Sequence, residues 1–338
     1  MKQPRRISRQ LEELPSLFDD IDINRSDIAA DIITRHRHLA EAREAAGAMT
    51  VSPAAADPGR QLKFISFGSG SSGNCAYIGT RQGGVLIDAG VDNNYVTDEL
   101  LRNGIDIDCV KGIILTHDHS DHVKYAYSLL RRRSSTLLYC TPKTLNGLLR
   151  RHNISRRIKD YHHAIYKEFS FEVAGMTITA FETSHDGSDN VGFAITAEDL
   201  TFVVTTDTGY ITERADYYMR RANYLMIESD YDLEMLRRGR YPEYLKARII
   251  SDTGHLDNMV TARYLADIWT PTLREVYLCH LSQDNNAPEI ALAAVSERLR
   301  ERNVSVITDD AAPTDNSLRL WALPRFKSSR LYILRPVE

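Results

Sequence analysis

The chain has 338 residues, of which 43% are hydrophobic and 26% are charged, and its formal net charge is −4. These values are ordinary for a folded globular protein, and they exclude a domain that coats nucleic acid by charge alone, because such domains are strongly basic. No apolar run approaches the roughly 20 residues of a membrane helix, and no apolar stretch follows the basic N-terminal residues, so the sequence predicts a cytoplasmic protein with neither a membrane partner nor a secretory signal.

Residues 1–60 differ in composition from the rest of the chain. The stretch 26–49 is rich in Ala, Glu and Arg and has helical periodicity, and 51–60 (VSPAAADPGR) is typical of a linker. The peptide LPSLF at 14–18 resembles short segments that dock onto bacterial sliding clamps. The sequence therefore predicts an N-terminal helical and linker extension over 1–60, where a protein-partner site and a solvent-exposed amphipathic turn are the two hypotheses, followed by one domain over 61–338.

From residue 62 onward, short apolar runs separated by turns predict a series of strands. The expected strands are 62–69, 75–80, 84–90, 110–117, 169–174, 176–183, 191–197, 200–207, 223–230, 275–280 and 304–309. Helices are expected at 93–102, 121–132, 261–269 and 291–300. An antiparallel meander followed by alternating strands and helices predicts an α/β or α+β sandwich, in which helices cover the outer faces of two sheets.

The segment THDHSDH at 116–122 carries the strongest chemical signal. It directly follows the apolar run 110–115 and supplies His117, His119, Asp121 and His122. Buried imidazoles and carboxylates are costly unless they are paired or bound to metal. A loop at the end of a strand can direct several of them to one point, so this pattern predicts metal ligands rather than a solvated polar loop.

Three further polar residues stand at the ends of later strands. His185 follows 176–183, Asp207 ends 200–207 and His280 ends 275–280. Each repeats the order of a strand followed by a possible ligand. Together with the motif they predict a site for two divalent cations, and nitrogen and oxygen ligands suit Zn²⁺ or Mn²⁺.

The order of these residues resembles the metallo-β-lactamase superfamily over about residues 62–308. The resemblance implies an αββα sandwich with an N-terminal extension, in which the 61–338 domain is a hydrolase. It also implies that His117, His119 and His185 hold one metal, that Asp121, His122 and His280 hold the second, and that Asp207 bridges them.

Finer features resemble the YycJ/WalJ type of bacterial DNA exonuclease, which is related to tRNA 3′-processing ribonuclease Z. These features are FGSGSSGNC at 67–75, IES at 227–229, TGHL at 253–256 and HLSQDNN at 280–286. Asn190 and Asp257 depart from the family pattern, in which Pro and Ser are frequent. The resemblance implies a dinuclear phosphodiesterase or exonuclease that acts on nucleic acid, most often DNA, through a metal-bridging hydroxide.

The same resemblance suggests roles for residues around the metals. Asp121 would orient the nucleophile, and His255, polarised by Glu228, would protonate the leaving group. A helix-capping histidine and an exposed carboxylate are the alternatives for these two residues. Small polar residues in two loops would contact substrate, or would instead only shape their turns: Ser69, Ser71, Ser72, Asn74, Ser282, Asn285 and Asn286.

Two other functions remain open from the sequence. One is a hydrolase of small phosphodiesters, such as cyclic nucleotides, or of thioesters. The other is a non-catalytic scaffold, which the presence of all seven predicted ligands disfavours.

Overall fold

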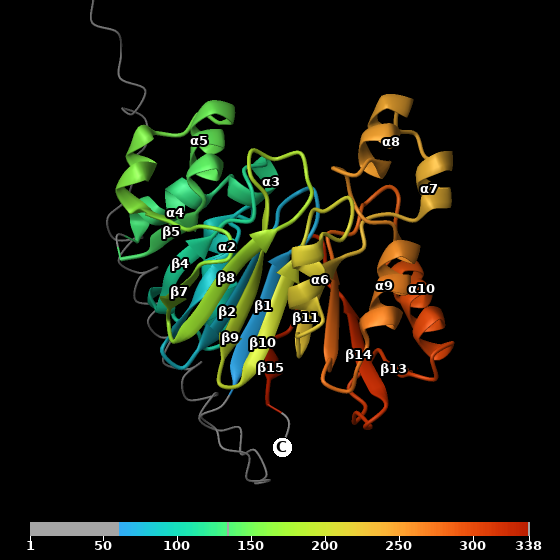
Figure 1. The fold of residues 1–338 in the computed structure, drawn as a ribbon. Helices are drawn as coiled ribbons and strands as arrows, with labels where there is room; N and C mark the ends of the chain where they lie inside the picture. Colours follow the sequence, from blue (N-terminus) through green and yellow to red (C-terminus); the bar gives the residue numbers. More distant parts are fainter. Residues whose placement is uncertain (1–60, 134, 337–338) are drawn as a thin grey trace, which may run out of the picture. The chain divides into compact units, whose positions relative to one another are not determined.

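The computed structural model describes residues 61–133 and 135–336 of the chain. In these residues two β-sheets lie face to face, and helices cover their outer sides (Figure 1). The α/β sandwich expected from the sequence is therefore confirmed. The predicted extension over 1–60, including the peptide at 14–18, lies outside the described residues.

The first sheet has the strand order β15-β1-β2-β3-β4-β5-β6. Its strands are β1 (Leu62–Gly68), β2 (Cys75–Thr80), β3 (Gly83–Ile87), β4 (Val110–Ile114), β5 (Leu137–Cys140), β6 (His162–Ala164) and β15 (Tyr332–Leu334). Strands β1, β2 and β3 pair antiparallel, whereas β3, β4, β5 and β6 pair parallel. The carboxyl ends of β3 and β4 therefore meet at one edge of the sheet.

The second sheet has the strand order β13-β14-β12-β11-β10-β9-β8-β7. Its strands are β7 (Ser170–Val173), β8 (Met176–Glu182), β9 (Val191–Ala197), β10 (Leu200–Thr205), β11 (Tyr224–Glu228), β12 (Glu275–Cys279), β13 (Ser305–Ile307) and β14 (Ser317–Ala322). The expected meander is β7 to β10, and β10, β11 and β12 pair parallel. Strands β8, β10, β11 and β12 therefore end at a common edge.

Helices pack on the outer face of each sheet. They are α2 (Asn93–Arg102), α3 (Ser120–Val123), α4 (Ala126–Arg132), α5 (Pro142–Arg151), α6 (Glu213–Met219), α7 (Leu233–Arg238), α8 (Glu243–Ile250), α9 (Asn258–Ile268) and α10 (Pro288–Arg300), with 3₁₀-helices at Ile107–Cys109 and Arg156–Tyr161. The single helix expected over 121–132 is split into α3 and α4. The break occurs because the backbone N–H of Tyr125 donates to the carbonyl of Ala89, at 2.8 Å, instead of continuing a helical ladder.

Apolar side chains fill the space between the sheets and the space under each helical layer. Between the sheets, the Phe64 ring lies 4.8 Å from the Phe202 ring and 4.9 Å from the Tyr277 ring, centroid to centroid. This packing fixes the two sheets against each other, so the loops at their shared edge are held on a rigid support. Among the described helices, none is both long and apolar enough to cross a membrane.

Candidate metal centre

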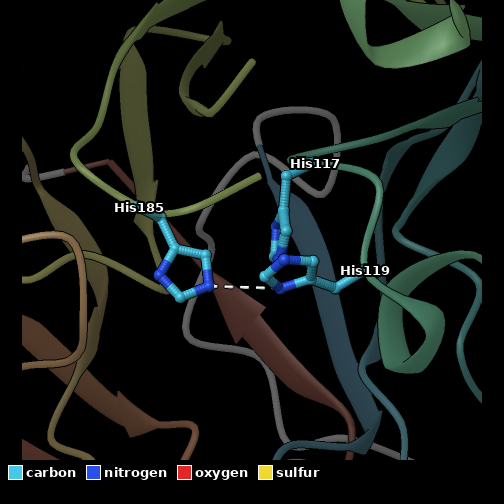
Figure 2. Close-up of side chains that lie close together, drawn as sticks. All are labelled: His117, His119 and His185. Carbon is cyan, nitrogen blue, oxygen red and sulfur yellow. Dashed lines mark hydrogen bonds between the residues drawn. The ribbon is translucent and has the colours of Figure 1, made fainter. Parts of the chain in front are cut away.

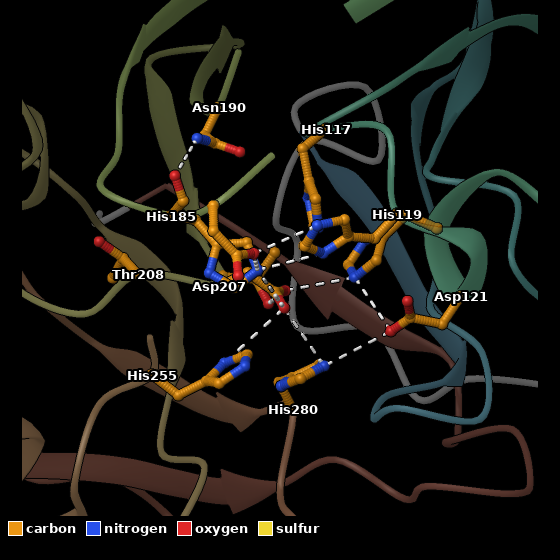
Figure 3. A network of polar contacts seen from close by, with 12 residues as sticks. His117, His119, Asp121, His185, Asn190, Asp207, Thr208, His255 and His280 are labelled. Carbon is orange, nitrogen blue, oxygen red and sulfur yellow. Dashed lines mark hydrogen bonds and ion pairs between the residues drawn. The ribbon is translucent and has the colours of Figure 1, made fainter. Parts of the chain in front are cut away.

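The seven predicted metal ligands converge at the edge where the strands of both sheets end (Figure 3). His117, His119, Asp121 and His122 follow β4, whereas the other three residues follow strands of the second sheet. Three overlapping groups of these residues offer ligand atoms that all lie within 4.8 Å of one another: His117, His119 and His185; His117, His122 and Asp207; and Asp121, His122 and His280.

Backbone strain marks three of the strand ends at this edge. Asp88, Asp207 and His280 have φ angles of 60°, 50° and 53°. The left-handed region is unfavourable for residues other than glycine, and such strain concentrates at functional sites where the surrounding structure supports it. Here it turns each side chain toward the centre directly after a buried strand.

The first group is an open triangle of imidazoles (Figure 2). The ring centroid of His117 lies 4.6 Å from that of His119 and 5.0 Å from that of His185. His185 Nε2 and His119 Nδ1 are 3.2 Å apart. Three imidazole nitrogens at this separation match the donor set of a zinc-type site.

Asp207 belongs to the second group, and it also faces His185 of the first group and His280 of the third. One carboxylate oxygen of Asp207 lies 3.3 Å from His122 Nε2, and the other lies 3.4 Å from His280 Nε2 and 3.9 Å from His185 Nε2. The Asp207 side chain is almost completely buried. It therefore lies between the first and the third group, where one carboxylate can serve both.

Three of the histidines present one ring nitrogen to the centre and engage the other with the protein. His122 Nδ1 lies 2.7 Å from the buried Asp88 carboxylate, and His185 Nδ1 lies 3.0 Å from the Gly254 carbonyl oxygen. His117 Nδ1 lies 3.0 Å from the hydroxyl of Thr116. Such contacts fix the tautomer and ring orientation of metal-ligating histidines.

The remaining two histidines follow the same arrangement through carboxylates. His119 Nε2 lies 3.2 Å from Asp186, which leaves Nδ1 facing His185. His280 Nδ1 lies 3.2 Å from Glu228, although this contact lacks hydrogen-bond geometry. In each of the five imidazoles, one ring nitrogen thus faces a polar group of the protein outside the predicted ligand set.

The donor set fits divalent cations. Within the described residues, His117 Nε2 and both ring nitrogens of His280 are buried without a hydrogen-bond partner. Burial lowers the pKa of His117, His119 and His185, which favours the neutral imidazole that coordinates metal. Buried polar atoms without partners are costly, and metal coordination would satisfy them.

The charges of the side chains in the centre also favour bound cations. Burial opposes ionisation of Asp207, but the imidazoles of His280 and His122 outweigh it and hold the Asp207 pKa well below its usual range. Burial likewise lowers the pKa of His122 and His280, but neighbouring carboxylates outweigh it and raise both pKa values. The carboxylates thus require nearby positive charge, and metal binding would release the protons that supply it.

His255 and Glu228 form a pair beside this centre. Glu228 is fully buried; one carboxylate oxygen lies 2.7 Å from His255 Nδ1, and the other accepts from the backbone N–H groups of Thr208 and Leu256. Burial disfavours the His255 cation, but Glu228 and Asp230 outweigh it and raise the His255 pKa to about 9. Glu228 is thus neither exposed nor unpaired, and it holds His255 in a defined orientation.

The loop 68–74 lies against the centre and uses its polar side chains unequally. Asn74 Nδ2 lies 3.1 Å from Asp121 and 3.0 Å from His122 Nε2, and Ser69 Oγ accepts from the backbone N–H of His280 at 2.8 Å. Ser71 and Ser72 are exposed. Ser69 and Asn74 therefore support predicted ligands, whereas Ser71 and Ser72 face solvent.

The loop after His280 is a hydrogen-bonded turn. Asn286 is buried and donates through Nδ2 to the carbonyls of Ser229 and Asp230, and the buried Asn285 contacts Ser282 Oγ. The side chain of Asn285 thus contacts its own turn, and that of Asn286 ties the turn to the segment after β11. Their contacts match the alternative in which they shape the loop that carries His280.

Sequence reasoning missed several residues of the centre. Asp88 directly follows β3 and has the same order of strand and polar residue as the predicted ligands, so that signal was available. Asp186 follows His185 and binds Arg248 of α8 at 2.7 Å. No pattern in the sequence indicates this contact, because the two residues are distant in the chain. Position 90 requires glycine, because a Cβ at this position would lie 1.5 Å from the Asp121 carbonyl oxygen.

Known proteins resemble most of this chain in sequence. Residues 84–281 match the family described as "Beta-lactamase superfamily domain". The exodeoxyribonuclease YycJ of Bacillus anthracis is 36% identical over 252 residues, which cover 72% of this chain and 92% of that protein. The exodeoxyribonuclease WalJ of Streptococcus pneumoniae is 31% identical over 251 residues, 73% of this chain and 92% of that protein.

Solved structures share the fold at low sequence identity. The metallo-β-lactamase fold protein YhfI of Bacillus subtilis has a TM-score of 0.58 at 14% identity, covering 81% of this chain and 99% of that one. The short form of human tRNase Z has a TM-score of 0.51 at 13% identity, covering 81% and 100%. The solved structures thus confirm the expected fold. The family match and the two exodeoxyribonucleases confirm the expected class of enzyme, a hydrolase, and the chain belongs to the beta-lactamase superfamily.

Proposed function

We propose that the chain is a nuclease that uses two divalent cations to hydrolyse phosphodiester bonds of DNA. The observation that carries the proposal is the meeting of five imidazoles and two carboxylates at one edge, with each imidazole oriented by a contact behind it. The exodeoxyribonucleases that match most of this chain support DNA as the substrate.

In this proposal His117, His119 and His185 would hold one cation, Asp121, His122 and His280 would hold the other, and Asp207 would serve both sets. When bound, the two cations would supply an activated water and offset charge on the phosphoryl oxygens. Asp121 and His119 are the most exposed of the seven predicted ligands, each with 19% of its side chain accessible. It would therefore orient the attacking water through its free oxygen.

His255 would donate the proton that the leaving oxygen needs. Its Nδ1 is engaged by Glu228, so Nε2 is the nitrogen that remains for the substrate. The His255 ring stacks on the His280 ring at 5.1 Å, centroid to centroid, with 14° between the ring planes. A proton donor fixed beside a ligand histidine is correctly situated for acid catalysis at the same phosphate.

The test is cleavage of end-labelled single- and double-stranded DNA, RNA and bis(p-nitrophenyl) phosphate by the full chain loaded with Mn²⁺ or Zn²⁺. DNA cleavage should require the metal and stop after chelation. His119→Ala should reduce the rate at least 100-fold, whereas His163→Ala, which changes an exposed histidine of β6 outside the centre, should not.

The pattern of substrates decides between nuclease and small-molecule hydrolase. Turnover of the small diester without cleavage of any nucleic acid would reject the nuclease proposal. Equal DNA cleavage by wild type and His119→Ala would reject the proposed site.

A further inference from the structure

A cavity of about 240 Å³ adjoins the candidate metal centre. Its lining includes Ser72 and Gly73 of the loop 68–74, Lys124 and Tyr125 just after the histidine motif, and Arg325 and Phe326 in the segment before β15. It is smaller than the roughly 300–1,000 Å³ of typical small-molecule sites. The cavity therefore suits one unit of a longer ligand.

Backbone contacts join this cavity to the centre. Gly73 lines the cavity, while the next residue, Asn74, donates from its backbone to the Asp121 carbonyl at 2.7 Å and from its side chain to the Asp121 carboxylate at 3.1 Å. On the other side, the Arg325 guanidinium donates to the Asn286 carbonyl at 3.4 Å, in the turn that follows His280. The walls of the cavity are thus connected to the segments that carry Asp121 and His280.

Two cationic side chains, Lys124 and Arg325, line the cavity. Lys124 is exposed, and its Nζ lies 5.2 Å from the centroid of the Tyr125 ring. Within residues 61–133 and 135–336, neither Lys124 nor Arg325 forms an ion pair. Asp92 also lines the cavity, but its carboxylate accepts from the backbone N–H groups of Asn94 and Tyr95 as the cap of α2. With two cations and one carboxylate, the lining has a net positive charge, which favours an anionic ligand.

The cavity also carries aromatic rings. Tyr95, Tyr125 and Phe326 line it, and Phe326 is 63% exposed. The segment that bears Phe326 is anchored, because the Ser328 N–H donates to the Tyr95 hydroxyl and the Ser329 N–H to the Ser66 carbonyl, each at 2.7 Å. A large apolar ring on an anchored segment is suited to stacking on a flat ligand.

Cations beside exposed aromatic rings are the elements by which proteins bind single-stranded nucleic acid. We propose that this cavity binds one unpaired nucleotide of the substrate strand, next to the scissile phosphodiester. Its base stacks on Phe326, and its phosphate lies between Lys124 and Arg325. The inference rests on the proposed nuclease function. It adds that the enzyme holds this nucleotide outside a duplex, with little preference for base identity, because every base has a face that stacks.

The first experiment compares kcat/KM for a single-stranded oligodeoxynucleotide with kcat/KM for bis(p-nitrophenyl) phosphate. The ratio of the two should fall about tenfold in Phe326→Ala and in the double variant Lys124→Gln, Arg325→Gln. Two controls should keep the wild-type ratio: Phe169→Ala changes an exposed aromatic before β7, and Lys327→Gln changes an exposed lysine beside Phe326 that does not line the cavity. Thermal unfolding checks that all variants are folded.

The second experiment removes the base instead of the ring. Oligonucleotides with one abasic residue, at either side of the cleaved bond, should lose about tenfold in kcat/KM with wild type at one of the two positions. At that position the abasic residue should cause no further loss of kcat/KM in Phe326→Ala, because the loss in wild type reflects the contact between this ring and the base. Independent, multiplying losses would overturn the inference.

The outcomes separate the two proposals. If wild type cleaves DNA and the cavity variants keep the wild-type ratio, the nucleotide site is wrong and the nuclease function stands. If wild type hydrolyses only the small diester, the nuclease function is wrong, and the nucleotide site is rejected with it.

Discussion

Asp88 is the residue that most clearly connects the first sheet to the candidate centre. Its carboxylate is buried at the end of β3, accepts from the backbone N–H and hydroxyl of Thr116, and contacts His122 Nδ1 at 2.7 Å. It thus fixes both the segment that begins the histidine motif and the ring of one predicted ligand.

Asp88→Asn should weaken metal binding about 10- to 100-fold, which is the usual effect of losing a carboxylate behind a ligand histidine. The amide keeps the shape of the side chain but loses the charge that orients His122. Competition with a chromophoric chelator measures the affinity. Asp98→Asn, on an exposed position of α2, is the matched control, and equal affinities in both variants would remove Asp88 from the account.

Among single residues, sequence patterns indicate the candidate ligands more completely than the residues that orient them. Each predicted ligand follows an apolar run, so the pattern of strand and polar residue was enough to propose it. Asp186, Arg248 and the lining of the cavity carry no such pattern, because tertiary packing alone brings them together. Asn285 and Asn286 illustrate the limit: the sequence gives their polarity, but not that both side chains are buried.

Among the helices, α9 begins at an informative residue. Asp257 caps it by accepting from the backbone N–H groups of Met259 and Val260 at 2.7 and 3.3 Å. Helix capping near this position was one alternative for His255, and Asp257 fills that role.

Asp257→Ala should lower the free energy of unfolding by about 1 kcal/mol, the typical value for a helix cap. Urea denaturation followed by circular dichroism measures the change. Asp309→Ala, an exposed residue outside the helices, should change stability by less than about 0.5 kcal/mol, and a larger loss there than at Asp257 would refute the role of the cap.

A surface ion pair ties the loop before β7 to α6. The hydrogen bond from Arg214, helped by Tyr218, outweighs partial burial and lowers the pKa of Glu168. A lowered folded-state pKa means that the pair stabilises the fold above the unfolded pKa of about 4.3, and that this contribution is lost as pH falls through the folded pKa.

Glu168→Gln should therefore cost at most about 1 kcal/mol near pH 7, since exposed pairs are weak and screened by water. The difference from wild type should shrink as the pH falls below about 4. Chemical denaturation across this pH range measures it, and a difference that grows on acidification would contradict the pair.

Strands and helices were predictable where the pattern was local. The meander β7 to β10 and the strands that carry ligands follow from apolar runs, whereas the short strands β5, β6 and β15 complete the first sheet only through long-range pairing. The split between α3 and α4 also depends on a distant contact, from Tyr125 to Ala89. Helical periodicity alone could not reveal it.

For the whole molecule, metal binding and folding should be linked. The predicted ligands follow strands of both sheets, so bound cations would hold the two sheets together at this edge. A cation at 100 times its dissociation constant stabilises the folded state by about 2.7 kcal/mol. Calorimetry should show that chelation lowers the Tm by several degrees and that His185→Ala abolishes the recovery on adding Zn²⁺, with His163→Ala behaving as wild type.

The most direct test is the number of divalent cations bound per chain, measured by elemental analysis after equilibration with Zn²⁺ or Mn²⁺ and gel filtration. A two-metal site predicts about two cations per chain in wild type, fewer in both His117→Ala and His280→Ala, and an unchanged number in His163→Ala. A chain that binds no cation, or whose bound cations are unaffected by His117→Ala and His280→Ala, would contradict it.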